Sequence, residues 1–380
     1  MPEPSADDRA ATPAAFSFED LVAAYFDCRR TKRNKPSALA FEQQLERNLS
    51  QLHDELVTGA YRPGPSICFV VTRPKPREVW AAAFRDRVVH HLLYRKIAPR
   101  FERAFIADSC ACIPGRGTLY AARRLEAKIR SATQNWSVPA YYLKCDLANF
   151  FVTIDKHVLW SLLEARIPEK WWQALTRQIL FHDPRPDVQL HSTPEIMALV
   201  PRHKQLRHQA PHLGLPIGNL SSQFFANVFL DVLDRHAKHD LRVQHYIRYV
   251  DDFLLLHESS AQLNAWLADL EVFLPRELGV RLNPTKTILQ PIARGVDFVG
   301  HVIKPWRRSL RRRTFNEALA RTAGLDAGDV YEAANSYFGL LRQAPASHHD
   351  RARLANVVRR RGHSVNRALT QTYRLPTSCS

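Results

Sequence analysis

Two adjacent aspartates stand inside a strongly apolar stretch, HYIRYVDDFLLLH, at residues 245–257. The β-prone runs at 246–250 and 253–256 flank Asp251 and Asp252, and this pattern predicts a β-hairpin with both acids at its tip. Turns accept aspartate well, but neighbouring carboxylates repel each other, and apolar surroundings raise that cost. A cation is therefore expected beside them, and an oxygen-only ligand set suits Mg²⁺. For such a pair taken alone, a solvated hairpin tip is the alternative.

A third carboxylate follows another predicted strand. The sequence YYLKCDLANFFVTID, residues 141–155, indicates a buried strand that ends on Asp146. A carboxylate at the end of a strand can meet the hairpin acids across neighbouring strands. Asp146 and Asp251 would then form the acid pair of two-metal phosphoryl chemistry, with the ions roughly 3.5–4 Å apart. Phe151 is an aromatic side chain placed to floor a sugar pocket.

The charge balance favours a polyanionic partner. The 380 residues include 54 Lys and Arg against 37 Asp and Glu, a net charge of +17. Nucleic acid is the usual partner of so basic a chain, although composition alone also fits an acidic membrane surface. The six cysteines include no CxxC pair, so we expect no zinc site and a reduced, cytoplasmic setting. No signal peptide or membrane span is expected either.

Several cations stand where they can meet phosphate groups. Prolines hold Arg73, Lys75 and Arg77 on a stiff backbone after a predicted strand at 67–72. Arg116 lies in a GRGT loop before a predicted helix, which suits a phosphate or template contact. The stretch KPWRRSLRRR carries no acid and predicts a surface for a nucleic-acid backbone, formed by Lys304, Arg307, Arg308, Arg311, Arg312 and Arg313.

Two further segments suit nucleotide or nucleic-acid contacts. Pro216, Ile217 and Gly218 form a tight loop before a helix with an apolar stripe, a setting that suits the base and sugar of a nucleotide. Asn219 or Ser221 can cap that helix. Lys286 follows a helix in the motif NPTKT and can reach a phosphate. Residues 182–212 are Pro-rich and basic, and we expect an excursion from the main sheet there that touches nucleic acid.

The order of these motifs resembles that of reverse transcriptases. VTRPKPRE, GRGT, CDLANFF, GLPIGNLSSQ, YVDD, NPTKT and FVGHVI follow one another over about residues 60–305, and SYFGLL matches the start of a thumb. Within this class, PIGNLSSQFFANVFLD resembles the branch found in diversity-generating retroelements, which is related to the group II intron enzymes. Retroviral and group II intron enzymes more usually have a Gln-Gly core in that loop.

The resemblance implies an α+β right-hand polymerase fold. An N-terminal helical extension would cover residues 1–58, and the fingers residues 59–140. The palm, an antiparallel sheet with helices, would cover residues 141–303 and include the excursion at 182–212. A basic helical thumb and a C-terminal tail would occupy residues 304–380.

The resemblance also implies roles for individual residues. Asp146, Asp251 and Asp252 would hold two Mg²⁺, for which Mn²⁺ could substitute, with the carbonyl of Leu147 as a further ligand. Phe151 matches the gate that excludes a 2′-hydroxyl and so selects deoxynucleotides. The cations that meet the triphosphate or the departing pyrophosphate would be Arg73, Lys75, Arg77 and Lys286.

Ile217 departs from the pattern, because many relatives have Gln at this position. In the branch that the chain resembles, copying is unfaithful at template adenines, and Ile217 is our candidate contributor. The implied partners are a structured template RNA, the RNA–cDNA duplex, dNTPs and a small basic accessory protein that is oligomeric.

Two alternatives remain open at this point. A retron-like or defence-associated reverse transcriptase would share the three acids but should carry extra domains or motifs. A non-catalytic RNA-binding protein on a polymerase fold should have lost an acid, whereas this chain retains all three.

Overall fold

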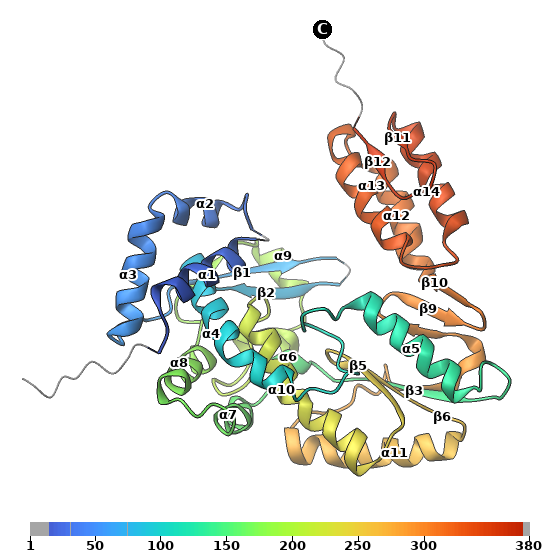
Figure 1. Ribbon diagram of the computed structural model, residues 1–380, viewed down its shortest axis with the longest axis horizontal. Coiled ribbons are helices and arrows are strands. Elements are labelled where there is room, and N and C mark those ends of the chain that lie inside the picture. Colours follow the sequence, from blue (N-terminus) through green and yellow to red (C-terminus); the bar gives the residue numbers. More distant parts are fainter. Residues whose placement is uncertain (1–14, 31, 74, 375–380) are drawn as a thin grey trace, which may run out of the picture. The chain divides into compact units, whose positions relative to one another are not determined.

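The chain forms two units in the computed structural model, which describes residues 15–30, 32–73 and 75–374 (Figure 1). The first unit takes in the chain up to Ile106 together with Leu147–His236 and Glu271–Leu282. The second unit takes in Ala107–Asp146, Ala237–Leu270 and the chain from Asn283 onward. Residues 1–14 of the predicted N-terminal extension lie outside the described residues.

Helices open the first unit. They are α1 (Phe18–Arg29), α2 (Pro36–Glu42), α3 (Leu45–Val57) and α4 (Phe84–Glu102). Ser17 and Asp20 form a capping box that starts α1, and Pro36 starts α2 at its first turn. The described part of the predicted N-terminal helical extension has three helices, since Pro36 begins a separate short helix between α1 and α3.

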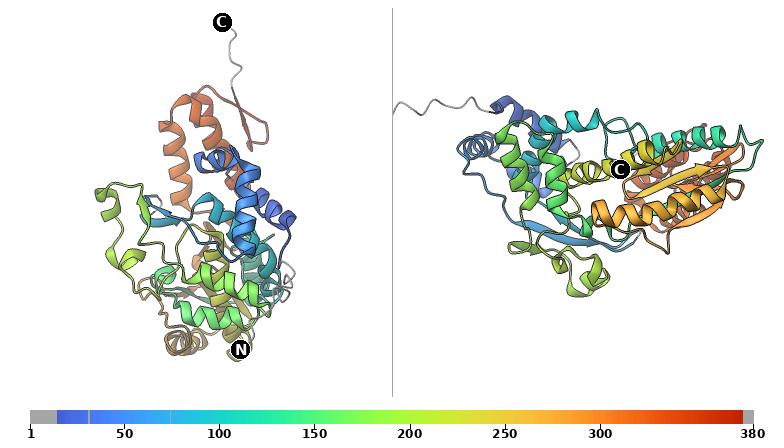
Figure 2. Two further views of the ribbon diagram at one scale, coloured as in Figure 1. Left: turned by 90° about the vertical axis from the view of Figure 1, so that its left-hand side faces the viewer. Right: turned by 90° about the horizontal axis from the view of Figure 1, so that it is seen from below.

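The remaining helices of this unit surround α10 (Leu220–Arg235), which packs on α4 and on α7 (Lys156–Glu164). Helix α8 (Lys170–Phe181) lies beside α7, as Figure 2 shows. Two short elements complete the set: α6 (Phe150–Thr153) and η5 (Leu274–Leu278). The predicted apolar stripe of α10 is buried at Phe225, Val228, Phe229 and Leu233.

The first unit also has a three-stranded sheet in the order β2-β1-β4. Strand β1 (Ser66–Val71), which was predicted at 67–72, pairs in antiparallel fashion with β2 (Arg77–Ala81). Strand β4 (Val188–Leu190), from the predicted excursion, pairs with β1 in parallel. The rest of the excursion comprises α9 (Pro194–Ala198), η2 (Arg202–Lys204) and η3 (Leu206–His208). The Leu206 N–H donates to the Glu78 carboxylate at 2.7 Å and so fixes the excursion to β2.

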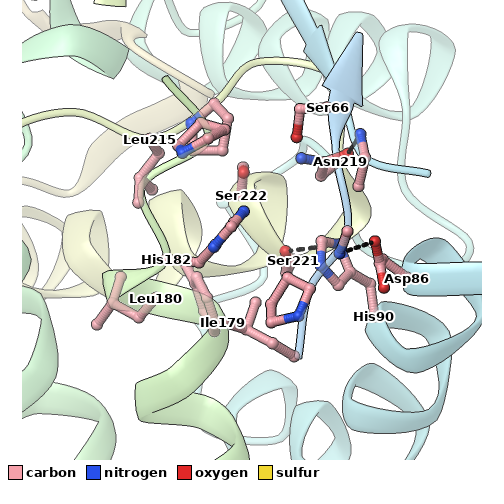
Figure 3. Close-up of a pocket in the computed structure, with 16 residues that line it drawn as sticks. Ser66, Asp86, His90, Ile179, Leu180, His182, Leu215, Asn219, Ser221 and Ser222 are labelled. Atoms are coloured by element: carbon pink, nitrogen blue, oxygen red, sulfur yellow. Dashed lines mark hydrogen bonds between the residues drawn. The ribbon is translucent and has the colours of Figure 1, made fainter. Parts of the chain in front are cut away.

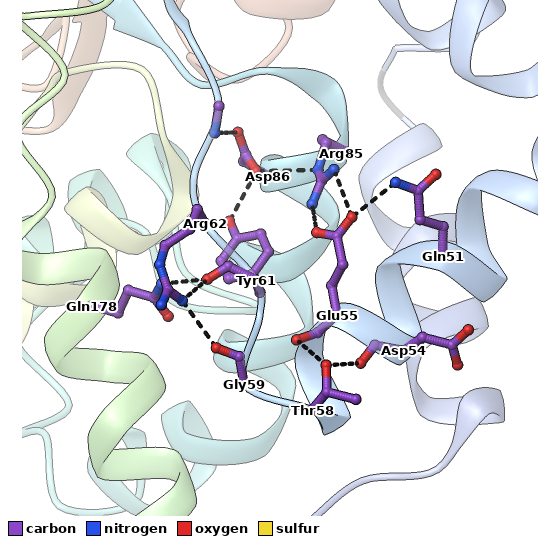
Figure 4. Close-up of polar contacts among 11 residues, drawn as sticks. Gln51, Asp54, Glu55, Thr58, Gly59, Tyr61, Arg62, Arg85, Asp86 and Gln178 are labelled. Carbon is purple, nitrogen blue, oxygen red and sulfur yellow. Dashed lines mark hydrogen bonds and ion pairs between the residues drawn. The ribbon is translucent and has the colours of Figure 1, made fainter.

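A polar network joins the segment after α3 to α4 (Figure 4). The Tyr61 hydroxyl and the Gly64 N–H each donate to the Asp86 carboxylate at 2.9 Å. Arg85, the neighbour of Asp86 on α4, forms an ion pair with Glu55 of α3. Asp86 is only 1% exposed, so these internal donors replace its water shell.

An antiparallel sheet in the order β5-β6-β3-β7 is the centre of the second unit. Its strands are β3 (Tyr141–Asp146), β5 (His245–Tyr249), β6 (Asp252–His257) and β7 (Ile288–Pro291). Helix α5 (Thr118–Ala132) covers one face, and α11 (Ser260–Phe273) covers the other (Figures 1 and 2). All side chains of the run 253–256 are therefore buried, since alternate residues meet one or the other helix layer.

The C-terminal part of the second unit is a small sheet followed by helices. This sheet has the order β10-β9-β8 and consists of β8 (Val296–Phe298), β9 (His301–Lys304) and β10 (Arg307–Leu310). Helices α12 (Arg312–Gly324), α13 (Ala327–Leu341) and α14 (His348–Arg360) share an apolar core. The short elements are η4 (His236–Asp240), η6 (Ile292–Arg294), β11 (Ser364–Val365) and β12 (Thr372–Tyr373).

The mixed α+β class predicted from the sequence is confirmed. Among the described residues, no helix combines the length and the apolar character needed to cross a membrane.

Candidate active site

The three predicted acids meet at one edge of the β5-β6-β3-β7 sheet. Asp146 ends β3 and is paired directly opposite Asp252, the first residue of β6. The pairing of Tyr249 with Asp252 leaves Asp251 in the turn between β5 and β6. Directly opposed residues of neighbouring strands have their Cβ atoms about 4.5–5.5 Å apart, so the carboxyl groups of Asp146 and Asp252 are neighbours. The hairpin tip and the strand end thus bring together residues that are far apart in the sequence.

The cations near this sheet edge do not fully neutralise its three carboxylates. Burial raises the pKa of Asp251 to about 6, and the charges of Asp146 and Asp252 act in the same direction. Burial also raises the pKa of Asp252, with Asp146 contributing, while Lys144 and Lys286 oppose the rise. Carboxylates in such a setting are stabilised by added positive charge.

Lys286 provides part of that charge. Its Nζ donates to Oδ1 and Oδ2 of Asp146 at 2.7 and 2.6 Å. We predicted a role for Lys286 near a departing pyrophosphate, and here it is the counter-ion of an acid. The amide of Asn283 also donates to Asp146 Oδ1 at 3.3 Å.

Sequence reasoning missed Asn283 and Lys144. Asn283 opens the turn that presents Lys286, because its Oδ1 accepts from the N–H and the hydroxyl of Thr285. An Asn followed by Pro in NPTKT is a signal of such a turn. Lys144 stands two residues before Asp146 on the same strand and so points to the same face of the sheet.

The donor set fits a hard divalent cation. Three carboxylates supply oxygen ligands, which Mg²⁺ prefers, and their mutual repulsion would be relieved by such an ion. No three His, Cys, Asp or Glu side chains form a ready metal cage within the described ranges. The Lys286 ammonium takes both oxygens of Asp146, so Asp146, Asp251 and Asp252 would share an ion once that pair opens. Leu147 is buried next to Asp146, and its carbonyl remains a predicted ligand.

The predicted nucleotide-binding residues, apart from Lys286, belong to the first unit. Arg73, Lys75 and Arg77 are exposed around the turn between β1 and β2. Phe151 is half-buried in α6 and packs edge-on against Phe150, with ring centroids 5.4 Å apart. The carbonyl of Phe151 accepts from the N–H of Leu215 at 2.8 Å, which places Phe151 beside the loop at 216–218.

Strand β2 holds that loop in place. The Trp80 N–H donates to the Ile217 carbonyl at 2.7 Å. Gly218 has φ +129°, and a Cβ at this position would lie 2.9 Å from the Trp80 carbonyl oxygen, so a larger residue does not fit. Asn219 stands before α10 but does not cap it, because its side-chain oxygen accepts from the Ala82 N–H at 3.0 Å. The predicted cap is wrong because the N–H of Ala82, the residue after β2, uses that oxygen.

An enclosed pocket lies behind the loop (Figure 3). It has a volume of about 20 Å³, room for a single water, so a nucleotide does not fit. Ser221 Oγ and His90 Nδ1 lie 3.2 Å apart, and burial lowers the pKa of His90 to about 3, so the ring is neutral. The other polar residues that line the pocket include Ser66, Asp86, His182, Asn219 and Ser222. These contacts indicate a structural role.

The predicted basic surface has fewer exposed cations than the sequence suggested. Arg308 is 5% exposed, and its Nε donates to Glu126 at 3.0 Å, so its assignment to the surface is wrong. Arg311 forms an ion pair with Asp297. Arg116 donates to the Ser109 carbonyl at 2.8 Å. The cations that remain exposed are Lys304, Arg307, Arg312 and Arg313.

Residues 74–303 match the family described as "Reverse transcriptase (RNA-dependent DNA polymerase)". This match includes the three acids and Lys286. Over 307 residues the chain is 23% identical to Protein YkfC of Escherichia coli (strain K12), an alignment that covers 72% of this chain and 74% of that protein.

Two telomerase structures are also similar. One is telomerase from Candida albicans in complex with a TWJ fragment of telomeric RNA, with a TM-score of 0.44 and 13% identity over 79% of this chain. The other is apo telomerase from Candida tropicalis truncated from its C-terminal domain, with a TM-score of 0.45 and 12% identity over 68% of this chain. The chain spans 56% and 59% of those two chains.

Proposed function

The chain belongs to the reverse transcriptase family and is an RNA-directed DNA polymerase; from this premise we propose that it makes adenine-mutagenic cDNA from a structured template RNA in a diversity-generating retroelement. The meeting of Asp146, Asp251 and Asp252 at one sheet edge, inside the region that matches the family, is the observation that carries the catalytic part. The branch assignment rests on the PIGNLSSQ loop.

The three acids are the proposed holders of two divalent ions, Mg²⁺ or in its place Mn²⁺. Such ions, when bound, activate the primer 3′-hydroxyl and neutralise charge on the phosphates. Asp146, Asp251 and Asp252 would hold the positive charge of these ions at the sheet edge. Lys286 leaves Asp146 to meet the departing pyrophosphate.

The first unit supplies the nucleotide contacts in this proposal. Arg73, Lys75 and Arg77 bind the triphosphate, for which their exposure around a tight turn suits them. Phe151 packs against the sugar and excludes a 2′-hydroxyl. The backbone hydrogen bond between Leu215 and Phe151 links α6 to the loop at 216–218. This link supports a single site for the sugar and the base of the nucleotide.

Ile217 is the proposed source of infidelity. The carbonyl of Ile217 accepts a hydrogen bond from β2, which fixes the backbone of this loop. The Ile217 side chain therefore extends from a fixed backbone. An aliphatic side chain cannot donate or accept a hydrogen bond, and a polar constraint on the incoming nucleotide is therefore lost.

A basic surface of the second unit is the proposed site for the RNA–cDNA duplex. Lys304, Arg307 and Arg312, with Arg353, line a hollow of about 510 Å³ between the β9–β10 hairpin and helices α12 and α14. Its cations suit a phosphate backbone. Fingers at 59–140, a palm at 141–303 and a thumb from 304 onward remain the proposed division. A small basic oligomeric accessory protein and a cytoplasmic setting complete the proposal.

Sequencing the DNA made from a defined RNA template with dNTPs and Mg²⁺ tests the proposed function. Errors concentrated opposite template adenines support the retroelement branch. Faithful DNA would instead identify a retron-like or defence-associated enzyme. If the folded protein binds RNA but makes no DNA under Mg²⁺ or Mn²⁺, it is a binding protein and the proposal fails.

A further inference from the structure

Arg248 is a fully buried arginine in β5, three residues before Asp251. A guanidinium keeps its charge and carries five N–H donors, so burying it costs several kcal/mol unless acceptors surround it. Its Nη1 donates to the Val250 carbonyl at 3.1 Å, and its Nη2 donates to the Ser109 hydroxyl at 2.8 Å. One side chain therefore joins the turn that carries Asp251 to a distant segment.

Val250 needs such support. It has φ +56°, a strained conformation that β-branched residues rarely adopt. Because Tyr249 pairs with Asp252, Val250 and Asp251 form a two-residue turn, where Gly or Asn would normally take the positive φ. The Val250 carbonyl and the Asp251 N–H share one planar peptide unit. A hydrogen bond that holds the carbonyl therefore orients the backbone of Asp251.

The other end of this contact is firmly anchored. Segment 108–110 runs beside β5 and makes two backbone hydrogen bonds of 2.9 Å with it, and Ser109 is fully buried. The carboxylate of Asp108 accepts from two cations of α5, Arg124 Nε at 2.7 Å and Lys128 Nζ at 2.8 Å. Because helix and sheet both hold this segment, the Ser109 hydroxyl is a fixed point.

We propose that Arg248, anchored by Ser109, is a positioning residue that sets the turn that carries Asp251 and leads into Asp252. The inference rests on the proposed function, since the turn matters for catalysis only if those acids act in DNA synthesis. A looser turn misplaces the carboxylates by a fraction of an ångström, which slows the chemical step and weakens metal binding without changing contacts to RNA or nucleotide.

The test compares Ser109→Ala and Arg248→Lys with the wild-type chain. Ser109→Ala removes one anchor and leaves the guanidinium in place, whereas Arg248→Lys keeps the charge but cannot bridge both acceptors. Each variant is assayed on a defined RNA template for kcat, for KM of dNTP and for the Mg²⁺ concentration at half-maximal rate. Ser347→Ala, at a serine of the same unit that is 1% exposed and precedes α14, is the matched control.

We expect kcat to fall about 10- to 100-fold in both variants, with KM for dNTP unchanged and the half-maximal Mg²⁺ concentration raised. Ser347→Ala should change none of these three quantities. A folded Ser109→Ala protein with wild-type kcat and Mg²⁺ dependence would overturn the proposal, even if Arg248→Lys does not fold.

Amide hydrogen exchange at residues 249–253 in the metal-free chain separates this inference from the proposed function. Faster exchange in Ser109→Ala than in wild type supports the positioning role even if no DNA is made. Equal exchange rates contradict it.

Discussion

Asp86 is a fully buried carboxylate and Asp251 is a partly buried one, and burial raises the pKa of each. Their neighbours differ in kind. The Tyr61 hydroxyl and the Gly64 N–H donate to Asp86, and both lower its pKa again. Asp251 instead faces further carboxylates, which raise its pKa.

This difference separates a structural acid from an acid of the proposed active site. A buried carboxylate with internal donors is satisfied by the fold and contributes to stability. A buried carboxylate among other carboxylates is costly for the fold and gains stability only when a cation arrives. The surroundings of a buried acid therefore indicate its role better than its depth does.

The sharpest way to break this comparison is Asp251→Asn. Loss of one carboxylate should lower DNA synthesis on the order of 10³-fold or more, because the phosphoryl-transfer site loses a charged ligand. RNA affinity should stay within about twofold, because that term comes from phosphate contacts elsewhere. Primer extension and filter binding measure the two quantities. Asp329→Asn, at an exposed acid of α13, is the control, and continued synthesis by Asp251→Asn would contradict the metal assignment.

Asp86→Asn should do the opposite. The amide keeps the shape of the carboxylate but removes the negative charge beside Arg85. Its NH2 group replaces one acceptor oxygen, so either the Tyr61 hydroxyl or the Gly64 N–H faces another donor and loses its hydrogen bond. The expected cost is about 2–4 kcal/mol in the free energy of unfolding, seen as a lower Tm. Well below that Tm, kcat per folded molecule should be unchanged. A wild-type Tm would show that the network in Figure 4 contributes little.

The pH dependence of stability tests the same region through His90. Its pKa is about 3 in the folded chain against about 6.5 when unfolded, so the unfolded state binds a proton that the folded state excludes. The stabilising difference is complete above pH 6.5 and is lost as pH falls toward 3. Between pH 7 and pH 5, the wild type should lose about 2 kcal/mol more than His90→Asn.

Asn at this position keeps an acceptor for the Ser221 hydroxyl without titrating, so the comparison isolates the proton. Thermal melts of both proteins at the two pH values measure the effect. Parallel decreases in Tm would mean that His90 is protonated at little cost in the folded state.

The smallest expected effect is that of Ile217→Gln, a change in the first unit that should alter function but not stability. A polar contact to the incoming nucleotide is worth about 1 kcal/mol, so misincorporation opposite template adenines should fall about fivefold. Sequencing of cDNA gives the error rate, and Tm should match the wild type. Ile217→Leu is the apolar control, and unchanged adenine errors in the Gln variant would remove Ile217 from the proposed mechanism.

Much of the site could be predicted because its signals are local. The β-prone runs and the turn preference in 245–257 predicted a hairpin with Asp251 and Asp252 at its tip, and in the structure Asp251 lies in the turn while Asp252 is the first residue of β6. The strand before Asp146 was equally plain. The apolar run in β6 marked a strand covered on both faces. These patterns need only neighbouring residues along the chain.

Other features depend on partners that the sequence does not place nearby. Arg308 sits in a basic stretch typical of a surface, yet Glu126, 182 residues away, holds it inside. Asn219 stands where a cap is expected, yet Ala82 takes its oxygen. In each case a long-range hydrogen bond outcompetes the local preference, since a buried polar group must find an acceptor or donor wherever the fold provides one.

The sequence by itself determined the hairpin and the strand that carry the three acids of the proposed site, because the period of the side chains and the chemistry of turns act over a few residues. Only the tertiary structure decided which charged groups form buried contacts that stabilise the fold. Asp86, Arg308 and Arg248 are bonded inside it, and their partners lie 22, 182 and 139 residues away. Burial makes these contacts obligatory, and burial is a property of the assembled chain.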